Sequence, residues 1–260
     1  MAGEPPDHAV RPPHESDGTV HPVRDPGRTA RPPYEESDRS LEAARDNAAW
    51  CDLVCRAHGR PGVFTGRVWT NPRRTPPFYP DAVTLSPDAT AADVLAGIDA
   101  GAGATVKDSF AALDLPGFEV LFEARWIHRA APGRTAAELP WDVVRDPATL
   151  AEWERACFGG EVTGLFPPAL LAEVTFLYGR VDGAIACGAV LTSTGPAVGV
   201  SNVFASGHAP GTLDTAWAGT LAMAAGLFPG RPLVGYETDP EPALRHGFTT
   251  AGPLRVWLRP

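Results

Sequence analysis

The pattern of apolar and polar positions in the first half of the chain predicts one long helix and several short strands. Apolar residues recur at helical spacing from Ser40, a candidate N-cap, to Ala57, and Gly59 follows the end of this run. Further along, alternating or short apolar runs predict strands, and a capping residue before small apolar residues predicts a second helix. The predicted strands cover 63–69, 82–85, 105–110 and 119–128, and the second helix covers 91–99.

The second half has the pattern of a strand meander followed by a strand, a helix and another strand. Pro147 suits a first helical position, which predicts a helix up to Cys157. The tight turn GRVDG between two apolar runs indicates a hairpin, and a helix of small residues follows the third strand. Strands are predicted at 174–178, 184–191, 197–205, 232–237 and 253–258, and helices at 212–227 and 240–246. The mixture predicts an α+β fold with a mixed sheet flanked by helices.

Composition divides the chain into three parts. Residues 1–38 are rich in Pro, Arg, Asp, Glu and His and have almost no apolar side chains. Such a segment buries too little apolar surface to offset the entropy of ordering, so we expect a disordered tail. The stretch AAPGRTA at 130–136 has the composition of a linker. It predicts a boundary between an N-terminal unit of residues 39–130 and a C-terminal domain of residues 137–260.

Charge and cysteine content narrow the classes of function. The formal net charge of −9 argues against a general binder of nucleic acid or of an anionic membrane surface. The N-terminus lacks the features of a signal peptide and the apolar run at 216–228 is too short to span a bilayer, so we expect a cytoplasmic protein. Cys51 and Cys55 lie four residues apart on the predicted helix and His58 follows one turn later, but no second Cys/His pair completes a zinc site. Buried thiols are therefore favoured, and no metal is expected.

A turn with two glycines, SGHAPG, follows the predicted strand 197–205 and leads into a helix that begins near Thr212. The first N–H groups of a helix are unpaired and carry partial positive charge, so this arrangement suits an anionic ligand. Gly207 and Gly211 would let such a ligand approach the backbone closely. His208, in the same turn, is either a contact to phosphate or a surface loop histidine.

The two halves of the chain end in similar segments. TVKDSFAALDLPGFEVLFEARWIHR and LVGYETDPEPALRHGFTTAGPLRVWLR each contain a carboxylate at a strand end, then GF, then Trp and Arg in the same order. Asp108 and Glu237 are the two carboxylates. This predicts two related units, of which the first is incomplete. Lys107, Asp108 and Ser109 are polar for a strand end, which a surface turn explains.

The second half resembles the GNAT (GCN5-related N-acetyltransferase) superfamily of acyl-CoA N-acyltransferases. The resemblance rests on the order of meander, helix, strand, short helix ending in GF and final strand. The segments SNVFA, AW, LFPGRPLVGYE and GPLRVWLR are similar in sequence to those of actinobacterial GNAT-like proteins that have two GNAT-like units in tandem. The resemblance covers Leu139 to Pro260 and reaches the first half only through its closing segment. It implies a GNAT-like sheet, complete in the second half and truncated in the first.

The resemblance also implies where an acyl-CoA would bind. In GNAT enzymes the strand before the main helix pairs with the pantetheine arm, and the following loop wraps the pyrophosphate. On this chain the arm would lie along Asn202, Val203, Phe204 and Ala205, and the pyrophosphate would meet Gly207, His208, Gly211 and Thr212. Two features of the family are absent: the Arg or Gln of the loop pattern, and the tyrosine shortly before the closing GF.

Glu237, Tyr236 and His246 are the candidate catalytic residues. Transfer to an amine needs a base, and an acid for the leaving thiolate. Glu237 ends a strand at the expected cleft with Tyr236 beside it, but Glu237 could equally accept helix N–H groups from the segment at Pro240. His246 is either an acid or base near neutral pH or a solvated histidine at a helix C-terminus. Asn202, with Ser201 before it, either hydrogen-bonds the ligand or marks where the sheet splays.

These observations favour an acyl-CoA-dependent, acetyltransferase-like N-acyltransferase that acts on an amine of a small molecule, with acetyl-CoA or another acyl-CoA as co-substrate. The missing Arg and Tyr keep two alternatives open. One is a catalytically degenerate GNAT-fold protein that binds a ligand or partner. The other is a GNAT whose acyl donor is a carrier-protein thioester or an aminoacyl-tRNA, although the acidic charge disfavours RNA. A homodimer is compatible with each of these.

Overall fold

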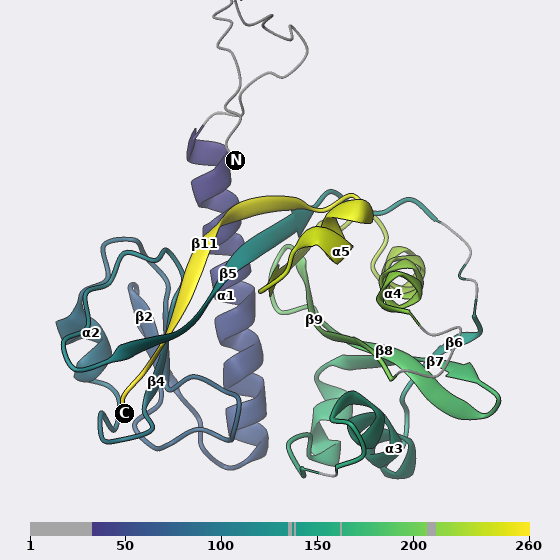
Figure 1. Ribbon diagram of the computed structural model, residues 1–260, viewed down its shortest axis with the longest axis horizontal. Helices are drawn as coiled ribbons and strands as arrows, with labels where there is room; N and C mark the ends of the chain where they lie inside the picture. Colours follow the sequence, from purple (N-terminus) through teal and green to yellow (C-terminus); the bar gives the residue numbers. More distant parts are fainter. Residues whose placement is uncertain (1–32, 135–136, 138, 162, 207–211) are drawn as a thin grey trace, which may run out of the picture. The chain divides into compact units, whose positions relative to one another are not determined.

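One mixed sheet runs through the part of the chain that the structure describes (Figure 1). The computed structural model describes residues 33–134, 137, 139–161, 163–206 and 212–260, with the backbone alone at 33–37. The strands are β1 (Val63–Phe64), β2 (Val68–Thr70), β3 (Ala82–Thr84), β4 (Thr105–Asp108), β5 (Glu119–Arg129), β6 (Trp141–Val143), β7 (Thr175–Val181), β8 (Ala184–Thr192), β9 (Val198–Ala205), β10 (Leu233–Glu237) and β11 (Thr249–Leu258). The helices are α1 (Pro33–Ala57), α2 (Ala91–Leu95), α3 (Pro147–Cys157), α4 (Leu213–Leu227) and α5 (Glu241–Arg245), with a 3-10 turn at Pro168–Ala172.

The order of the strands is β1-β2-β3-β4-β11-β5-β10-β9-β8-β7-β6. Parallel pairs join β3 to β4 and β9 to β10, and α2 and α4 respectively connect the strands of these two pairs. The α2 connection is a helix of 5 residues, whereas α4 has 15. The predicted α+β sheet flanked by helices is therefore confirmed. The parallel strand–helix–strand unit of the first half, β3-α2-β4, has the shorter helix of the two.

The last strand of each half lies between strands of the other half. β5, from the first half, pairs with β10 on one side and β11 on the other, and β11 pairs with β4 and β5. Figure 1 shows β5 and β11 side by side in front of α1. The pair Ala124–Leu254 lies near the middle of their antiparallel ladder. Residues 32–260 accordingly cluster as one compact unit.

The single strand predicted at 63–69 is wrong: the residues form two short strands, β1 and β2, that pair antiparallel. Three other elements differ clearly in extent from their sequence predictions. α1 begins at Pro33 rather than at Ser40, since proline is well tolerated in the first turn, where its missing N–H would have no partner. The second helix stops at Leu95 after a single capped stretch, in which Thr90 and Asp93 form a capping box. β11 begins at Thr249, because pairing with β5 continues through the irregular register at Gly252. None of the described helices is long and apolar enough to cross a membrane.

Helix α1 packs across one face of the sheet, over β11, β10, β5 and β9. Its small buried residues Ala43 and Ala44 allow close contact with Trp126, Val234 and Leu254 in the strands beneath. On the second half, α3 and α4 cover opposite faces of the meander (Figure 1). The sheet is thus covered on the α1 side by two elements, α1 and α3, that come from different halves.

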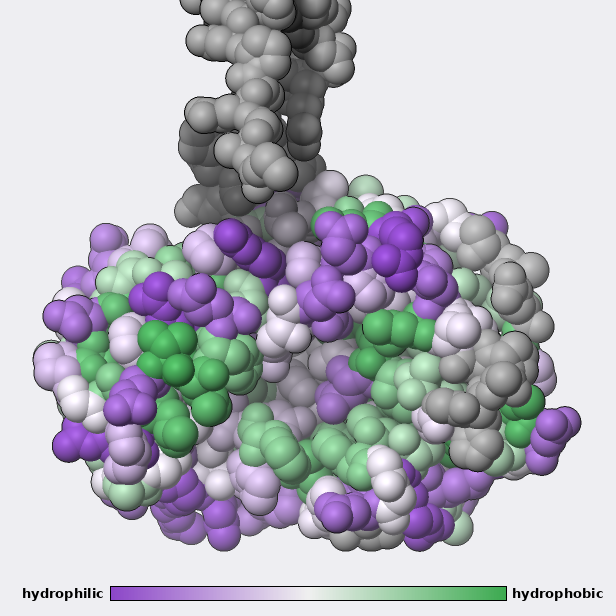
Figure 2. All heavy atoms as spheres, in the orientation of Figure 1, coloured by the Kyte–Doolittle hydropathy of each residue, from purple (hydrophilic) through white to green (hydrophobic). Residues whose placement is uncertain are grey.

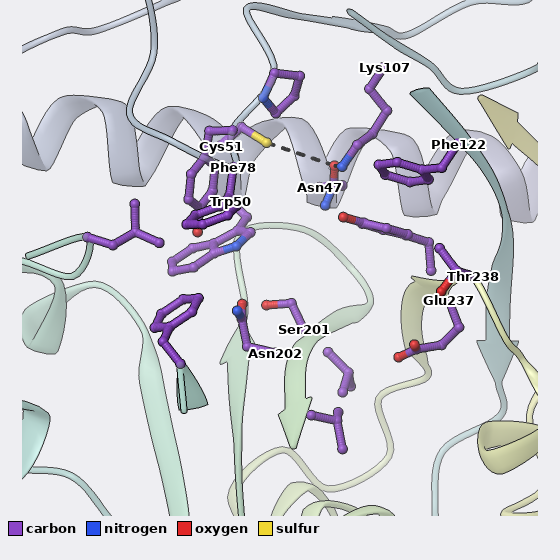
Figure 3. A pocket seen from close by; sticks show the side chains of 17 residues that line it. Asn47, Trp50, Cys51, Phe78, Lys107, Phe122, Ser201, Asn202, Glu237 and Thr238 are labelled. Atoms are coloured by element: carbon purple, nitrogen blue, oxygen red, sulfur yellow. Dashed lines mark hydrogen bonds between the residues drawn. The ribbon is translucent and has the colours of Figure 1, made fainter. Parts of the chain in front are cut away.

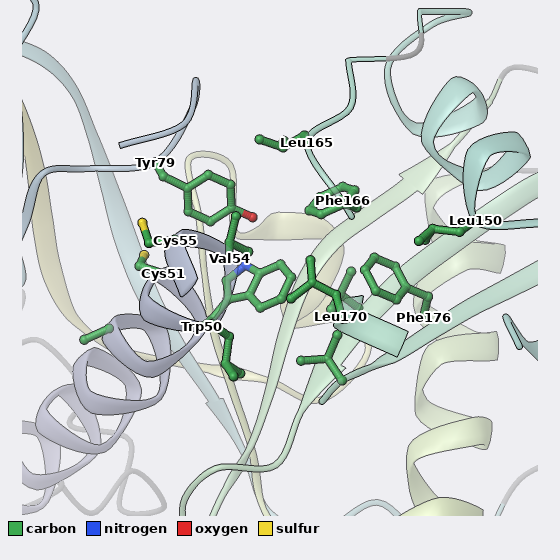
Figure 4. Close-up of a cluster of buried hydrophobic side chains, with 14 of the residues drawn as sticks. Trp50, Cys51, Val54, Cys55, Tyr79, Leu150, Leu165, Phe166, Leu170 and Phe176 are labelled. Atoms are coloured by element: carbon green, nitrogen blue, oxygen red, sulfur yellow. The ribbon is translucent and has the colours of Figure 1, made fainter. Parts of the chain in front are cut away.

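The largest apolar cluster lies between α1 and the α3 region (Figure 4). Trp153 is fully buried and contacts the rings of Phe166, Phe176 and Phe204 at centroid distances of 5.6, 5.1 and 5.1 Å. Burial of each such side chain contributes roughly 1.5–3 kcal/mol, so this cluster joins the halves firmly. Cys51 and Cys55 are buried in it, as the sequence predicts, and burial raises their thiol pKa values to about 11 and about 12.

A buried carboxylate fixes α1 against the sheet. Asp46 is only 9% exposed, and both of its oxygens lie 3.0 Å from the hydroxyl of Thr192 on β8. A Cβ atom at Gly199 would lie 1.8 Å from Asp46 Oδ2, so only glycine lets the carboxylate approach β9 here. Burial raises the pKa of Asp46 from 3.8 to about 7, against the opposing effect of the Thr192 hydrogen bond.

Replacing Asp46 by Asn should therefore stabilise the protein above pH 7. The folded protein holds the Asp46 proton more tightly than the unfolded chain does. The contribution of Asp46 to the free energy of unfolding is therefore full below about pH 4 and is lost as the pH rises through about 7. An amide keeps an acceptor and a donor for its neighbours without the buried charge. We expect a gain of at most about 4 kcal/mol at pH 8 and almost none at pH 4, measured by urea unfolding.

The exposed Asp88 provides the matched control. Asp88→Asn should change the free energy of unfolding by less than about 0.5 kcal/mol at either pH. A lower stability of Asp46→Asn at pH 8 would mean that the ionised carboxylate is a net stabilising partner of Thr192 in the folded protein.

Candidate functional site

The two parallel strands of the second half separate into a fork. β9 and β10 pair only at Val198–Leu233 and Gly199–Val234. Beyond these pairs, β9 continues to Ala205 and β10 to Glu237 without a common ladder. A Cβ atom at Gly235 would lie 2.6 Å from the carbonyl oxygen of Val200, so glycine is needed at the base of the fork. Backbone groups that lose their ladder partner in this way are available to a ligand.

A β-bulge shapes the β9 side of this fork. The register with β8 shifts between Gly188–Phe204 and Val190–Ser201, and Asn202 in the bulge has φ of 50°. Asn is one of the few residues that adopts this left-handed region readily. Bulges re-aim side chains and are over-represented beside active sites. Here the bulge turns Ser201, Asn202 and Val203 towards the fork.

A cavity of about 320 Å³ lies at the fork, on the side covered by α1 (Figure 3). In the space-filling view the surface is hollowed near its centre, between the surfaces over β5 and β9 (Figure 2). The polar lining residues are Asn47, Lys107, Ser201, Asn202, Glu237 and Thr238. The aromatic lining residues are Trp50, Phe78, Tyr79, Phe122, Phe158 and Tyr236. Such a volume, with a few polar groups among aromatic ones, is typical of small-molecule sites.

Glu237 is half-buried in the cavity wall and accepts no hydrogen bond from the described residues. Burial, with a smaller effect of the nearby Asp239 carboxylate, raises the pKa of Glu237 from 4.5 to about 7. The alternative that Glu237 caps the following helix is wrong, because Asp239 Oδ1 accepts the Glu241 N–H at 3.2 Å instead. Glu237 is thus a carboxylate whose proton can be gained and lost near neutral pH.

Tyr236 lines the same cavity and is held between two side chains. The ammonium of Lys107 lies 4.1 Å from the centre of the Tyr236 ring, and Trp126 packs edge-on at 5.7 Å. Trp126 is itself fixed, since its indole N–H donates to the Ser109 carbonyl at 2.7 Å. The structure therefore brings Tyr236 and Glu237 together with the predicted ligand-binding residues Asn202 and Val203.

The interpretation of Lys107, Asp108 and Ser109 as a surface turn is wrong. Their exposed fractions are 4%, 1% and 0%, because β4 lies inside the sheet between β3 and β11. Asp108 closes its strand by accepting the N–H groups of Leu113 and Phe110 at 2.8 and 3.3 Å. Lys107 instead points into the cavity wall, where its ammonium donates to Asn47 Oδ1 at 2.8 Å. Lys107, Asn47 and Trp50 are site residues that the sequence reasoning missed.

His246 lies elsewhere, at the C-cap of α5. Its Nε2 is 3.2 Å from Asp214 Oδ1 in the first turn of α4, and Arg245 contacts the same carboxylate at 2.9 Å. The structure does not bring His246 into the lining of the cavity with Glu237. The alternative of a solvated histidine does not fit either, because its side chain is only 19% exposed.

The remaining predicted ligand-binding residues divide between packing, capping and the part of the chain not described. The Phe204 ring packs against Trp153, and Ala205 packs beside Cys187. Thr212 caps α4 by accepting the Thr215 N–H at 3.2 Å. Gly207, His208 and Gly211 lie outside the described residues. Within those that are described, no three His, Cys, Asp or Glu side chains are grouped to hold a metal ion.

Comparison with solved structures identifies this arrangement of strands. A GCN5-related N-acetyltransferase from Kribbella flavida superposes with a TM-score of 0.53 over 84% of this chain and 95% of its own, at 16% identity. A putative GNAT-family acetyltransferase from Novosphingobium aromaticivorans gives 0.51 over 84% and 99%, also at 16% identity. The chain has the GNAT fold. No family model and no curated protein matches the sequence.

Within the GNAT fold, the fork between β9 and β10 belongs to the unit that the sequence resemblance covers. The superposed share of the chain, 84%, is larger than the second half alone, so the likeness includes strands from both halves. The cavity is likewise shared: α1, the loop at Phe78 and β4 supply one wall, and β9 and β10 supply the other.

Proposed function

We propose that the protein is an acyl-CoA-dependent N-acyltransferase that acts on an amine of a small molecule. The observation that carries this proposal is Glu237: a carboxylate with no hydrogen-bond partner among the described residues, at the fork of a GNAT fold, with its pKa raised to about 7. A general base works best when its pKa lies near the working pH. Glu237 meets this condition for removing a proton from an amine.

The donor side of the fork suits an acyl-CoA in two respects. Beyond Val200, the edge of β9 that faces β10 has no ladder partner, so its N–H and C=O groups are available to an amide-containing arm. The N-terminus of α4, capped by Thr212, offers first-turn N–H groups to a pyrophosphate. Arg245 and His246 both contact the Asp214 carboxylate in this turn and so offset its negative charge beside the proposed pyrophosphate position. The bound acyl-CoA would supply an acyl group activated as a thioester.

The side chains of the cavity then have distinct tasks. Glu237 would take one proton from the ammonium of the acceptor, and burial stabilises the neutral carboxyl group that results. As the nitrogen forms a bond to the thioester carbon and the carbon–sulfur bond breaks, the nitrogen would release its second proton, which replaces the proton given to the leaving thiolate. Tyr236, whose ring is fixed by Lys107 and Trp126, is our candidate for donating a proton to the leaving thiolate. The apolar lining excludes water from the reacting groups.

Binding of acetyl-CoA tests this proposal directly. A ligand present at about 100 times its dissociation constant should add ~2.7 kcal/mol to the free energy of unfolding, which thermal unfolding detects readily. Gly235→Ala should weaken acetyl-CoA binding at least about tenfold by calorimetry, because the new methyl group would press against the Val200 carbonyl and distort the fork.

Gly195→Ala is the matched control, since a Cβ atom there meets no atom within 4 Å. It should bind acetyl-CoA as the unmodified chain does. If millimolar acetyl-CoA produced no shift in the unmodified protein, the donor would not be acetyl-CoA, and a carrier-protein thioester or a role in ligand binding alone would take its place.

A further inference from the structure

We propose that the amine accepted by this protein also carries an acidic group, and that Lys107 binds this group in the cavity. The inference rests on the proposed function, because it specifies the acceptor of that transfer. It makes the acceptor an amino acid or a related amino-acid-like compound rather than a simple amine.

Lys107 is the only lysine in the sequence and is 4% exposed. Among the described residues its ammonium makes one hydrogen bond, to Asn47, and no ion pair. An ammonium has three N–H donors, and buried charges in proteins are nearly always paired. The cavity that Lys107 lines is where an anionic partner can reach it.

The ammonium is held in position before any ligand arrives. Asn47 Oδ1, which accepts from Lys107 at 2.8 Å, also lies 3.9 Å from Cys51 Sγ on the next turn of α1. The Tyr236 ring fixes the other side through the cation–π contact at 4.1 Å. Neither neighbour is a negatively charged group, so both orient the lysine without neutralising it.

A second polar group in the cavity wall also lacks a partner in the part of the chain that the structure describes. The hydroxyl oxygen of Ser201 is buried and makes no hydrogen bond to any described residue. Buried hydroxyl groups in proteins are generally satisfied, so this oxygen indicates a polar ligand in the cavity. Figure 3 shows Ser201 and Asn202 across the cavity from Lys107, with Glu237 at the side.

The charges of the cavity complement those of an amino acid. Glu237 suits the ammonium group of the acceptor, and Lys107 suits its acidic group. The aromatic side chains of Trp50, Phe78 and Phe158 form an apolar part of the lining. Phe78 and Phe158 stack at 5.8 Å, which joins the two halves beside the cavity. An apolar side group on the acceptor would lie there.

Matched pairs of acceptors test the inference in an acetyl-transfer assay. Phenylalanine and 2-phenylethylamine differ only by the carboxylate, as do leucine and 3-methylbutylamine, and 1-amino-2-phenylethylphosphonate replaces the carboxylate by a phosphonate. We expect kcat/KM to be at least about 100-fold higher for an acid-bearing acceptor than for its plain amine. The phosphonate arm distinguishes a site for carboxylate from one for phosphate-like groups.

Lys107→Met should remove this preference: KM for the acid-bearing acceptor should rise until kcat/KM is about equal for the two acceptors of a pair, and any change in kcat that follows from losing the contact with the Tyr236 ring should affect both acceptors alike. Lys107→Arg should restore part of the preference, because the charge is kept. Arg73→Met, which removes an exposed cation from the neighbouring loop, is the control and should keep the preference. Thermal unfolding without ligand confirms that each variant is folded.

Binding of 3-phenylpropionate, an acid without an amine, separates this inference from the proposed function. The unmodified protein should be stabilised by it and Lys107→Met should not, whether or not acetyl transfer occurs. Acetyl transfer with equal kcat/KM for phenylalanine and 2-phenylethylamine would overturn the inference and leave the function intact. Failure of every acid probe to bind, or acetylation of Lys107 itself seen by mass spectrometry, would also overturn it.

Discussion

Glu237→Gln should lower kcat by about 10²- to 10⁴-fold, the range expected for loss of a general base. The amide has nearly the same shape as the carboxyl group but cannot take a proton from the acceptor. Acetyl-CoA binding should remain, because Glu237 lies on β10 and the backbone groups of β9 are unchanged. Steady-state kinetics with calorimetry on the same preparation separates the two effects.

The pH dependence of kcat/KM provides a sharper test of the same residue. Because burial raises the pKa of Glu237 to about 7, the base is protonated and inactive at pH 5 and ionised at pH 8. The rate should therefore rise with pH along a limb centred near pH 7, and Glu237→Gln should lack this limb. Asp239→Asn should move the limb to lower pH, since the Asp239 carboxylate contributes to the raised pKa.

A reduced kcat of the Glu237→Gln variant could not be attributed to unfolding of the protein. The raised pKa means that the ionised carboxylate costs folding free energy above pH 7, and glutamine removes that cost, at most about 3 kcal/mol. The variant should thus be at least as stable as the unmodified chain at pH 8. Turnover equal to that of the unmodified protein would remove Glu237 from the mechanism.

The local order of elements in the second half could be predicted from the sequence, because the signals are local. The hairpin turn before β8, Pro147 and Asp146 at the start of α3, and Thr212 at the start of α4 act within a few residues of themselves. The same holds for the strand end at Tyr236 and Glu237. These local signals, with the resemblance, were enough to place two of the three candidate catalytic residues at the cavity.

The exchange of β5 and β11 could not be predicted, because strand order depends on contacts between residues more than a hundred positions apart. No local pattern distinguishes a strand that pairs within its own half from one that pairs with the other half. Lys107, Asp108 and Ser109, at the end of a predicted strand, read as a surface turn for the same reason. Lys107 is buried because β11, from the other half, pairs with β4, and its ammonium is bound by Asn47 of α1, sixty residues earlier. The one available signal was that Lys107 is the sole lysine of the chain.

The predicted division into residues 39–130 and 137–260 leads to the last test. Expressed alone, residues 137–260 should fail to fold cooperatively, because both neighbours of β11, namely β4 and β5, belong to the first half. β10 would keep only its short pairing with β9. Far-UV circular dichroism should show loss of most of the sheet signal, and thermal unfolding should show no cooperative transition.

Residues 33–130 should fail alone for the complementary reason, since β5 would lose both β10 and β11. Its Trp126 and Ile127, both fully buried in the intact chain, would face water, and this would favour aggregation. Co-expression of the two fragments should restore the fold. Cleavage of the intact chain within residues 130–134, which carry neither helix nor strand, should leave the fold unchanged. A cooperative transition in residues 137–260 alone would instead show that β11 can find a partner within its own half, and that a single GNAT unit is sufficient to fold.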